Sequence, residues 1–332
     1  THSIGELDVI LPIASKLIST NSINVEMRFI SKKLYNQFLK SDFYLFCVKT
    51  LQINVRLSVL PNKYDLRDNF LNSIIGGKLT ILIYKKILSV ICFPLHLYSL
   101  IKSDIYMHEY SNQIESTFYF YLMSKLFKKR IFVYHHGHTI NIDTKFSIEK
   151  RKKADATYLN FHEHNNNYVN QLPYKKQVII GYPKFYKEWK KLIIQYNSKN
   201  RIEDKYVLIF TRAISHAYMD KDKYEKLLIT SYNSIRNKVN DIKIIIKKHP
   251  REDDGFVEKI INTNKMKNIY ISNDHAGVLS RNALFVISFW TSAILDSISF
   301  GIPSVEYYIE SNNFRKNEPK GSVFKNLGIE SV

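Results

Sequence analysis

The sequence predicts an α/β protein in which two Rossmann-like domains, each built on an open parallel sheet, face each other across a cleft. Three observations lead to this prediction. Short β-like runs alternate with longer helical stretches, which is the pattern of stacked βαβ units. The alternation stops in a polar, charged stretch at 184–204 and restarts after it. The chain has 332 residues, enough for two domains that each bury a core.

The first half of the chain alternates between the two patterns. The expected helices are 8–18, 31–39, 69–100 as one or two helices, and an aromatic-rich helix at 117–127. The expected strands are 26–30, 104–108, 130–134, 156–160 and 177–180, with a further short run at 44–48. A polar loop is expected at 135–143.

The second half repeats the pattern after the proposed linker. The expected strands are 206–210, 242–246, 268–271, 284–287 and 304–308. The expected helices are 222–239, 255–263, 276–282 and 292–300. We therefore place one domain at 1–185, a linker at 186–204 and a second domain at 205–332. Ligands of open α/β sheets bind beyond the carboxyl ends of the strands, so we expect the chemistry in the loops there.

The chain is strongly basic, with 49 Lys and Arg against 30 Asp and Glu and a formal net charge of +19. The excess is mostly lysine, scattered through a sequence rich in Ile, Asn, Tyr and Phe. We interpret it as a general attraction to phosphates, anionic lipid or an anionic substrate. Zinc-finger, RRM and Walker patterns are missing from the sequence, so we expect no nucleic acid partner.

The cysteines and histidines do not follow a metal-binding pattern. Cys47 and Cys92 lie in apolar runs without CxxC spacing, which is typical of buried thiols in a reducing cytoplasm. Six of the eleven histidines lie between His108 and His164, but they lack the HExxH spacing and no cysteine accompanies them. We expect neither a metal nor another cofactor.

The start of the chain lacks the features of a secretory signal, and we expect a cytoplasmic protein. The most apolar stretch, 79–101, is interrupted by Lys85, Lys86, Pro94 and His96. Its longest charge-free run falls short of the roughly 20 residues that span a bilayer. A buried helix or one lying on the membrane fits better, which makes peripheral attachment to the inner face of the cytoplasmic membrane reasonable.

The sharpest motif is Lys247-Lys248-His249-Pro250, which directly follows the expected strand at 242–246. Pro250 restricts the turn, so His249 is held at a carboxyl end of the sheet. There His249 can donate to a phosphate oxygen while Lys247 or Lys248 supplies charge. An ordinary turn is the alternative interpretation.

A second motif is Thr291-Ser292, which follows the expected strand at 284–287 and opens a helix. The two hydroxyls then lie near the backbone N–H groups of a helix N-terminus, which is a ready anion site. A simple N-cap is the alternative.

Two further strand ends add candidates to the same nucleotide pocket. Thr211 and Arg212 follow the strand at 206–210 and supply a third anion contact. Glu306, in the last strand, can accept a hydrogen bond from a ribose hydroxyl.

These motifs resemble the nucleotide-binding half of two related groups, the bacterial polysialyltransferases with their His-Pro and Ser-Ser/Thr motifs and the teichoic-acid-type CDP-glycerol glycerophosphotransferases. The matching runs are Lys248-His249-Pro250, Ser288-Phe-Trp-Thr291-Ser292-Ala-Ile-Leu-Asp296 and Gly301-Ile-Pro303. The resemblance covers roughly residues 206–310. It implies the GT-B fold, a C-terminal domain that binds the phosphates of a CMP- or CDP-linked donor, and an N-terminal domain that binds the acceptor.

In the first half, Tyr134-His135-His136-Gly137-His138-Thr139 is similar to the Trp-His-Gly-Thr motif of the glycerophosphotransferases, with one residue inserted before the Thr. The resemblance implies that His136 is the catalytic base. The chemistry requires a group that takes a proton from the acceptor hydroxyl, which a histidine or a carboxylate can do near neutral pH. His138 and Glu109 are therefore the alternatives to His136.

Two acidic residues near the start are candidates for acceptor binding. Glu6 and Asp8 belong to the run Gly5-Glu6-Leu7-Asp8, which should face the cleft if a strand precedes it. A charge pair at a helix N-terminus is the alternative.

The leading hypothesis is a metal-independent GT-B glycosyltransferase. It would move a sugar from a nucleotide-activated donor, with a CMP-sugar favoured, to a glycan or lipid-linked glycan acceptor of bacterial capsule or lipopolysaccharide. Fixed donors and cations would stabilise the leaving phosphate in place of a metal ion. Two alternatives stay open, a CDP-polyol phosphotransferase of the teichoic-acid type and a non-catalytic polyanion-binding module.

Overall fold

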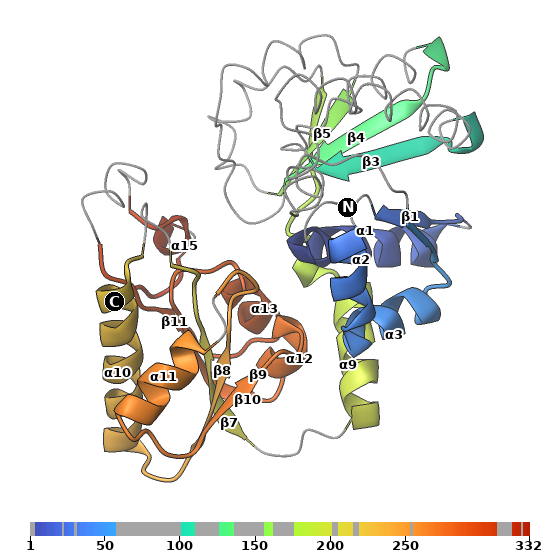
Figure 1. Ribbon diagram of the computed structural model, residues 1–332. Coiled ribbons are helices and arrows are strands. Elements are labelled where there is room, and N and C mark those ends of the chain that lie inside the picture. Colours follow the sequence, from blue (N-terminus) through green and yellow to red (C-terminus); the bar gives the residue numbers. More distant parts are fainter. Residues whose placement is uncertain are drawn as a thin grey trace, which may run out of the picture. The chain divides into compact units, whose positions relative to one another are not determined.

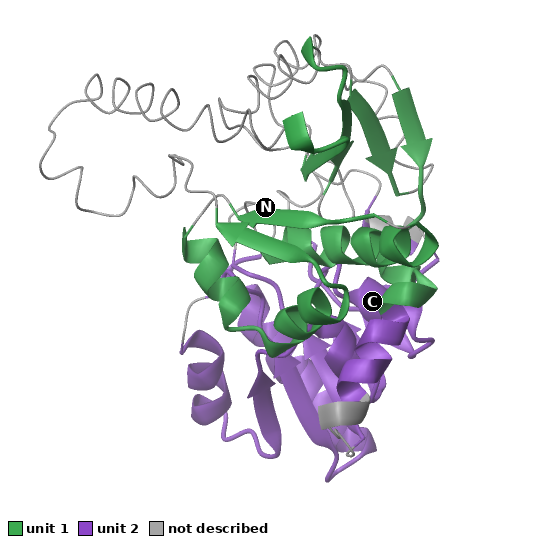
Figure 2. Cartoon of the chain, turned by 90° about the vertical axis from the view of Figure 1, so that its right-hand side faces the viewer, with its two compact units in different colours: residues 1–189 green, residues 190–332 purple. Residues whose placement is uncertain are grey.

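The computed structural model divides into two compact units, residues 1–189 and 190–332 (Figure 2). The residues that it describes are 4–21, 23–29, 32–57, 101–109, 126–135, 156–161, 176–200, 205–214, 219–252, 255–310, 321–326 and 328–332. Several predicted features lie outside the described residues, namely the helices at 69–100, nearly all of the helix at 117–127, Cys92, His136, His138, His162 and His164.

Unit 1 contains two parallel sheets (Figure 1). The main sheet has the order β3 (Ile105–Glu109), β4 (Arg130–Tyr134), β5 (Ala156–Asn160) and β6 (Lys176–Ile179). The smaller sheet pairs β1 (Glu26–Phe29) with β2 (Asn54–Leu57). All but β2 were expected from the sequence.

The helices of unit 1 are η1 (Ile4–Glu6), α1 (Leu7–Thr20), α2 (Lys32–Leu39), α3 (Asp42–Thr50) and η4 (Pro183–Phe185). The short run at 44–48 lies inside α3, which the hydroxyl of Ser41 caps by accepting from the backbone N–H of Tyr44. Helix α1 packs on the main sheet because Val9 and Ile13, four residues apart, share one helix face. They form a core cluster with Tyr134 and Leu159.

Unit 2 contains one sheet of five parallel strands. Its order is β11 (Ser304–Glu306), β10 (Ala283–Ser288), β7 (Tyr206–Phe210), β8 (Lys243–Lys247) and β9 (Ile269–Ser272). Its helices are α10 (Lys221–Lys238), α11 (Phe256–Thr263), α12 (Ala276–Ser280), α13 (Ile294–Ser299) and α15 (Val323–Asn326). Every strand from 206 onwards that the sequence predicts is present.

The central strands β7 and β8 of this sheet are buried on both faces. Val207 and Ile209 of β7 belong to a core cluster that includes Leu227 of α10, whereas Leu208 belongs to a second cluster that includes Leu279 of α12. Successive side chains of a strand alternate between the two faces, so one unbroken apolar run supplies both cores. Polar side chains are thereby confined to the ends of the strands.

The stretch at 186–204, interpreted from its polarity as a linker, is mostly helical and forms α9 (Lys187–Asn200). The boundary between the two units falls within this helix. Its unit 2 part is tied down by packing, since Ile193 is buried and Asn197 donates to the backbone carbonyl of Val278 at 3.1 Å.

Two further features bear on the sequence predictions. Over the described parts of the chain, no helix combines the length and the apolar character needed to cross a membrane. Cys47 is a buried free thiol, and burial raises its pKa far above the usual range.

Candidate functional site

The polar residues of unit 2 gather at the carboxyl edge of its sheet. The chain runs from β7 outward to β8 and β9, and then returns to β10 and β11 on the other side of β7. The strand order therefore changes direction at β7, which is where open α/β sheets bind their ligands. Arg212 follows β7 and His249 follows β8, and the loop after β10 contains Trp290.

His249 is neutral and holds its ring proton on Nε2. The backbone N–H of Arg251 donates to its Nδ1 at 3.2 Å, so Nδ1 is the acceptor nitrogen. Burial, followed by repulsion from Arg251, Arg212 and Lys247, lowers the pKa of His249 from 6.5 to about 4. The half-buried ring is therefore a neutral hydrogen-bond donor among three cations, an arrangement suited to an anionic ligand.

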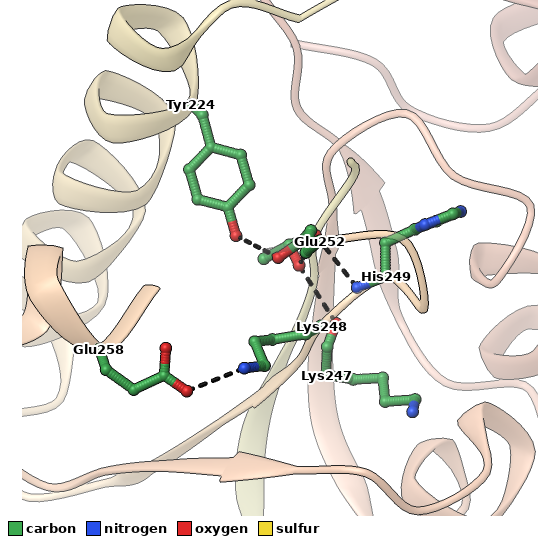
Figure 3. Close-up of polar contacts among 7 residues, drawn as sticks. Tyr224, Lys247, Lys248, His249, Glu252 and Glu258 are labelled. Carbon is green, nitrogen blue, oxygen red and sulfur yellow. Dashed lines mark hydrogen bonds and ion pairs between the residues drawn. The ribbon is translucent and has the colours of Figure 1, made fainter. Parts of the chain in front are cut away.

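The carboxylate of Glu252 fixes the turn that contains His249 (Figure 3). One oxygen, Oε1, accepts from the Thr211 hydroxyl at 2.5 Å and from the backbone N–H of His249 at 3.0 Å. The other, Oε2, accepts from the Tyr224 hydroxyl at 2.9 Å. Burial raises the pKa of Glu252, and these hydrogen bonds oppose the increase. One side chain thus joins the ends of β7 and β8 to helix α10.

Thr211 and Lys248 were expected to contact the donor, and the structure gives both another partner. The Thr211 hydroxyl donates to Glu252, and Lys248 Nζ lies 2.8 Å from Glu258 Oε1 on α11. Lys247 leaves the chain in a different direction from Lys248 (Figure 3), and its Nζ donates to the Asn273 carbonyl at 3.0 Å. Of these two lysines, only Lys247 is among the causes of the lowered pKa of His249.

Arg212 lies against Trp290. Its Nη1 donates to the Trp290 carbonyl at 2.6 Å, and its guanidinium carbon lies 4.0 Å from the centroid of the indole ring. A cation over an aromatic face is attracted by the ring's quadrupole. Arg212 is half-buried, so its position is fixed while part of it stays accessible.

Glu306, which we expected to accept from a ribose hydroxyl, is fully buried. Its two oxygens accept from the hydroxyls of Ser322 and Ser331, each at 2.8 Å. Burial raises its pKa to about 7, against the effect of the two serines and of the charge of Arg212. A ribose would have to displace both serines to reach it.

The remaining donor candidates lie in the turn after β10 and in the turn after β8. Helix α13 begins at Ile294, two residues later than expected, with Ala293 as its N-cap. Thr291 and Ser292 are half-buried before it, and the backbone N–H of Thr291 donates to Ser288 Oγ at 3.3 Å. Pro250 is exposed in its turn.

Sequence reasoning missed two residues of this site, Glu252 and Trp290. Glu252 follows His249 by three residues, and a carboxylate at that spacing can reach back to a backbone N–H, as in a capping box. The run His-Pro-Arg-Glu was therefore enough to predict that Glu252 accepts from the backbone N–H of His249. The role of Trp290 depends on Arg212, which is 78 residues away in the chain, and no local pattern indicates it.

In unit 1, two of the predicted residues lie together. Glu6 and Glu109 are both buried, and both raise the pKa of Tyr134, although burial of the phenol is the larger cause. Glu6 has the same effect on Tyr106, whose pKa burial raises to about 12. The base candidate Glu109 and the acceptor candidate Glu6 thus both lie near the buried phenol of Tyr134.

Asp8, the other acceptor candidate, has two partners from later parts of unit 1. Tyr44 donates to Asp8 Oδ1 at 2.7 Å, and Lys184 Nζ lies 3.7 Å from Oδ2. Across the described part of the chain, no group of three His, Cys, Asp or Glu side chains is arranged to hold a metal ion.

No protein-family profile and no curated protein match the sequence. Solved structures are similar in fold. S. aureus MnaA, solved with UDP, is 13% identical, has a TM-score of 0.55, and matches over 96% of this chain and 80% of its own. A putative UDP-N-acetylglucosamine 2-epimerase from Listeria monocytogenes is 10% identical, with a TM-score of 0.52 over 92% and 77%. The UDP-GlcNAc 2-epimerase of Methanocaldococcus jannaschii is 11% identical, with a TM-score of 0.50 over 93% and 89%.

These structures have the GT-B fold, so the predicted α/β class and the GT-B fold are confirmed for this chain. The match runs over nearly the whole chain and includes both units.

We predict that the His249 ring titrates at about pH 4, which an NMR titration of its Hε1 signal would measure. Arg251→Gln should raise this pKa, because it removes a repelling charge but keeps the backbone N–H that bonds to Nδ1. As the pH falls, His249 becomes protonated in the unfolded chain at about 6.5 but in the folded protein only at about 4. The free energy of unfolding should therefore decrease over this pH range. The control is Lys259→Gln, on the exposed side of α11, which also removes a positive charge and should leave the pKa of His249 unchanged. Titration near 6.5 would contradict the assignment.

We predict that Glu252→Ala lowers the free energy of unfolding by about 2–4 kcal/mol, because three donors lose a partly buried acceptor. Glu252→Gln keeps one acceptor oxygen and should cost about 1 kcal/mol. Urea unfolding measures both. Glu258→Ala is the matched control, since it removes a partly exposed ion pair worth less than about 1 kcal/mol. Equal losses in Glu252→Ala and Glu258→Ala would refute the role of Glu252.

Proposed function

We propose that the protein is a glycosyltransferase that uses a nucleotide-activated sugar. The observation that carries the proposal is the neutral His249, which lies at the carboxyl edge of a GT-B sheet among Arg212, Lys247 and Arg251. A neutral donor flanked by cations suits a phosphate ester, since it adds a directed hydrogen bond to a general attraction. The similar S. aureus MnaA was solved with UDP, which supports a nucleotide ligand for this fold.

The proposed donor chemistry is stabilisation of the leaving phosphate. As the bond between sugar and phosphate breaks, negative charge grows on the phosphate oxygens. Arg212 and the Nε2–H of His249 would meet that charge, and both are held in place before the reaction by Trp290 and Glu252. Fixed donors of this kind support the proposal that catalysis is independent of a metal ion.

The finer parts of the proposal come from the sequence motifs. A CMP-sugar as donor and a capsule or lipopolysaccharide glycan as acceptor follow from the resemblance to polysialyltransferases. We assign the base to His136, with His138 and Glu109 as alternatives. The burial of Glu109 disfavours it, because an acceptor hydroxyl would have to reach a carboxylate that is away from solvent.

A nucleotide-sugar 2-epimerase is the second candidate. Two of the similar solved structures are described as UDP-GlcNAc 2-epimerases, one of them as putative. An epimerase needs the same donor site but no acceptor. Incubation with UDP-GlcNAc alone distinguishes the two. An epimerase forms the 2-epimer under these conditions, whereas a transferase without its acceptor does not.

We predict that one nucleotide of the panel CMP, CDP, UDP, GDP and ADP raises the melting temperature by several degrees at a concentration of about 100 Kd. CMP or CDP is expected, and His249→Ala should abolish the shift while the variant stays folded. Lys259→Ala, which removes an exposed charge on α11, should keep it. The reason is that His249 offers the phosphate a fixed donor, whereas Lys259 is exposed on α11.

The other outcomes of the panel each select an alternative. A shift with UDP or GDP would keep the fold's nucleotide site and discard the cytidine preference. Shifts of equal size with every polyanion, unchanged in His249→Ala and steeply dependent on salt, would favour the polyanion-binding module.

We predict that His136→Ala lowers kcat by a factor of about 100 or more and changes donor affinity little, because a base acts on the acceptor and not on the nucleotide. Glu109→Gln should have a much smaller effect on kcat. Steady-state kinetics with the donor selected by the panel would measure both. Normal turnover in His136→Ala would exclude His136 as the base.

A further inference from the structure

Trp290 holds Arg212 through two contacts at once. The carbonyl of Trp290 accepts from Arg212 Nη1 at 2.6 Å, and its indole ring lies under the guanidinium, 4.0 Å from the guanidinium carbon. One contact fixes the position of the guanidinium and the other fixes its plane. Arg212 therefore loses little freedom when an anion binds, provided that Trp290 keeps its conformation.

The conformation of Trp290 requires support from its surroundings. Its φ is +54°, in the left-handed region that residues with a Cβ rarely adopt and that persists only where neighbouring groups impose it. The side chain is buried, and its Nε1–H donates to Ser322 Oγ at 3.1 Å. This bond connects Trp290 to a segment of the chain that lies 32 residues later.

The direction of the hydrogen bonds at Ser322 is fixed. Its Oγ accepts from Trp290 Nε1 and from the backbone N–H of Phe324, which lies at 3.2 Å. A hydroxyl has one proton and two lone pairs, so the remaining proton points to Glu306 Oε1 at 2.8 Å. Ser322 and Glu306 are both fully buried. Ser322 can therefore hold the indole only while Glu306 presents an acceptor.

Ser331 donates to the same carboxylate but does not belong to the series of contacts that runs from Glu306 through Ser322 to Trp290. Its hydroxyl donates to Glu306 Oε2 at 2.8 Å, and residues 329–332 run along β11, with the backbone N–H of Glu306 donating to the Glu330 carbonyl. Ser322 and Ser331 each give Glu306 one hydrogen bond, but only Ser322 touches Trp290. The two serines are therefore a matched pair for experiment.

We propose that Ser322 and Glu306 are positioning residues for the donor site. They hold Trp290 in its left-handed conformation, and Trp290 in turn holds Arg212 ready to bind a phosphate group of the nucleotide. The proposal rests on the function proposed above, in which Arg212 is a phosphate ligand. It places part of the donor site's architecture in the segment after residue 320.

The first test uses the free protein and NMR. The chain has two tryptophans, Trp189 and Trp290, so Trp189→Phe assigns the two indole N–H signals. Arg212→Lys assigns the Nε–Hε signal of Arg212, which the indole face should shift upfield. Ser322→Ala should move the Trp290 signal and remove the upfield shift of Arg212. An Arg212 signal that is unchanged in Ser322→Ala overturns the proposal.

The matched control in the same spectra is Ser331→Ala, which should leave both signals in place. Melting temperatures show how far each variant is destabilised. If Ser331→Ala displaces the Arg212 signal as much as Ser322→Ala does, the effect is a general loss of stability and the positioning role fails.

The second test measures affinity for the nucleotide that the panel selects. Ser322→Ala should weaken binding by a factor of about 5 or more, and Ser331→Ala by less than about 2. Glu306→Ala should resemble Ser322→Ala. Glu306→Gln should bind nearly normally, because its amide oxygen still accepts from Ser322, and Ser331 can turn its proton to the Ile329 carbonyl, 3.4 Å away.

These outcomes separate the two proposals. Equal weakening in Ser322→Ala and Ser331→Ala, or a loss of binding in Glu306→Gln as large as in Glu306→Ala, overturns the positioning role. If the unmodified protein binds no nucleotide, the proposed function fails, while the Arg212 and Trp290 signals still decide whether Ser322 positions Arg212.

Discussion

The burial of the central strands β7 and β8 on both faces of the unit 2 sheet is the constraint on which the rest of the unit depends. All five residues of β7 are buried, and core clusters lie on either side of it. Charged side chains cannot be hydrated inside such a sheet, so they concentrate where the strands end. Because the strands are parallel, loops that are separated by about 40 residues in the chain meet at one edge. The topology thus gathers Arg212, His249 and Trp290 without any local pattern that links them.

A cluster of cations at that edge repels itself, and the structure anchors it through neutral donors. Glu252 is held by two hydroxyls and a backbone N–H, and Glu306 by two serines. Each carboxylate therefore fixes a loop mainly through neutral donors. A carboxylate away from solvent that accepts several such bonds is costly to disturb, which makes these loops rigid.

The sequence predicted the strands well because a strand buried on both faces is a continuous apolar run, as at 206–210 and 242–246. It missed α9, where Trp189, Leu192, Ile193 and Tyr196 follow helical spacing inside a charged stretch. The sequence also placed the motif around His249 correctly at a strand end. It did not predict the partners of the other donor-site candidates. Thr211, Lys248 and Glu306 each find a tertiary partner, and such partners come from chain segments that no local pattern connects.

The depressed pKa of His249 has a further consequence for the proposed reaction. Burial, then Arg251, Arg212 and Lys247, keep a second proton off the ring in the free protein. A bound phosphate would offset the three cations, and its own charge would favour the protonated ring, so the pKa of His249 would rise on binding. His249 would then donate most strongly when the leaving phosphate gains its charge. The phosphate would thus offset the cations that keep a second proton off His249 in the free protein, and the protonated ring would stabilise the leaving group.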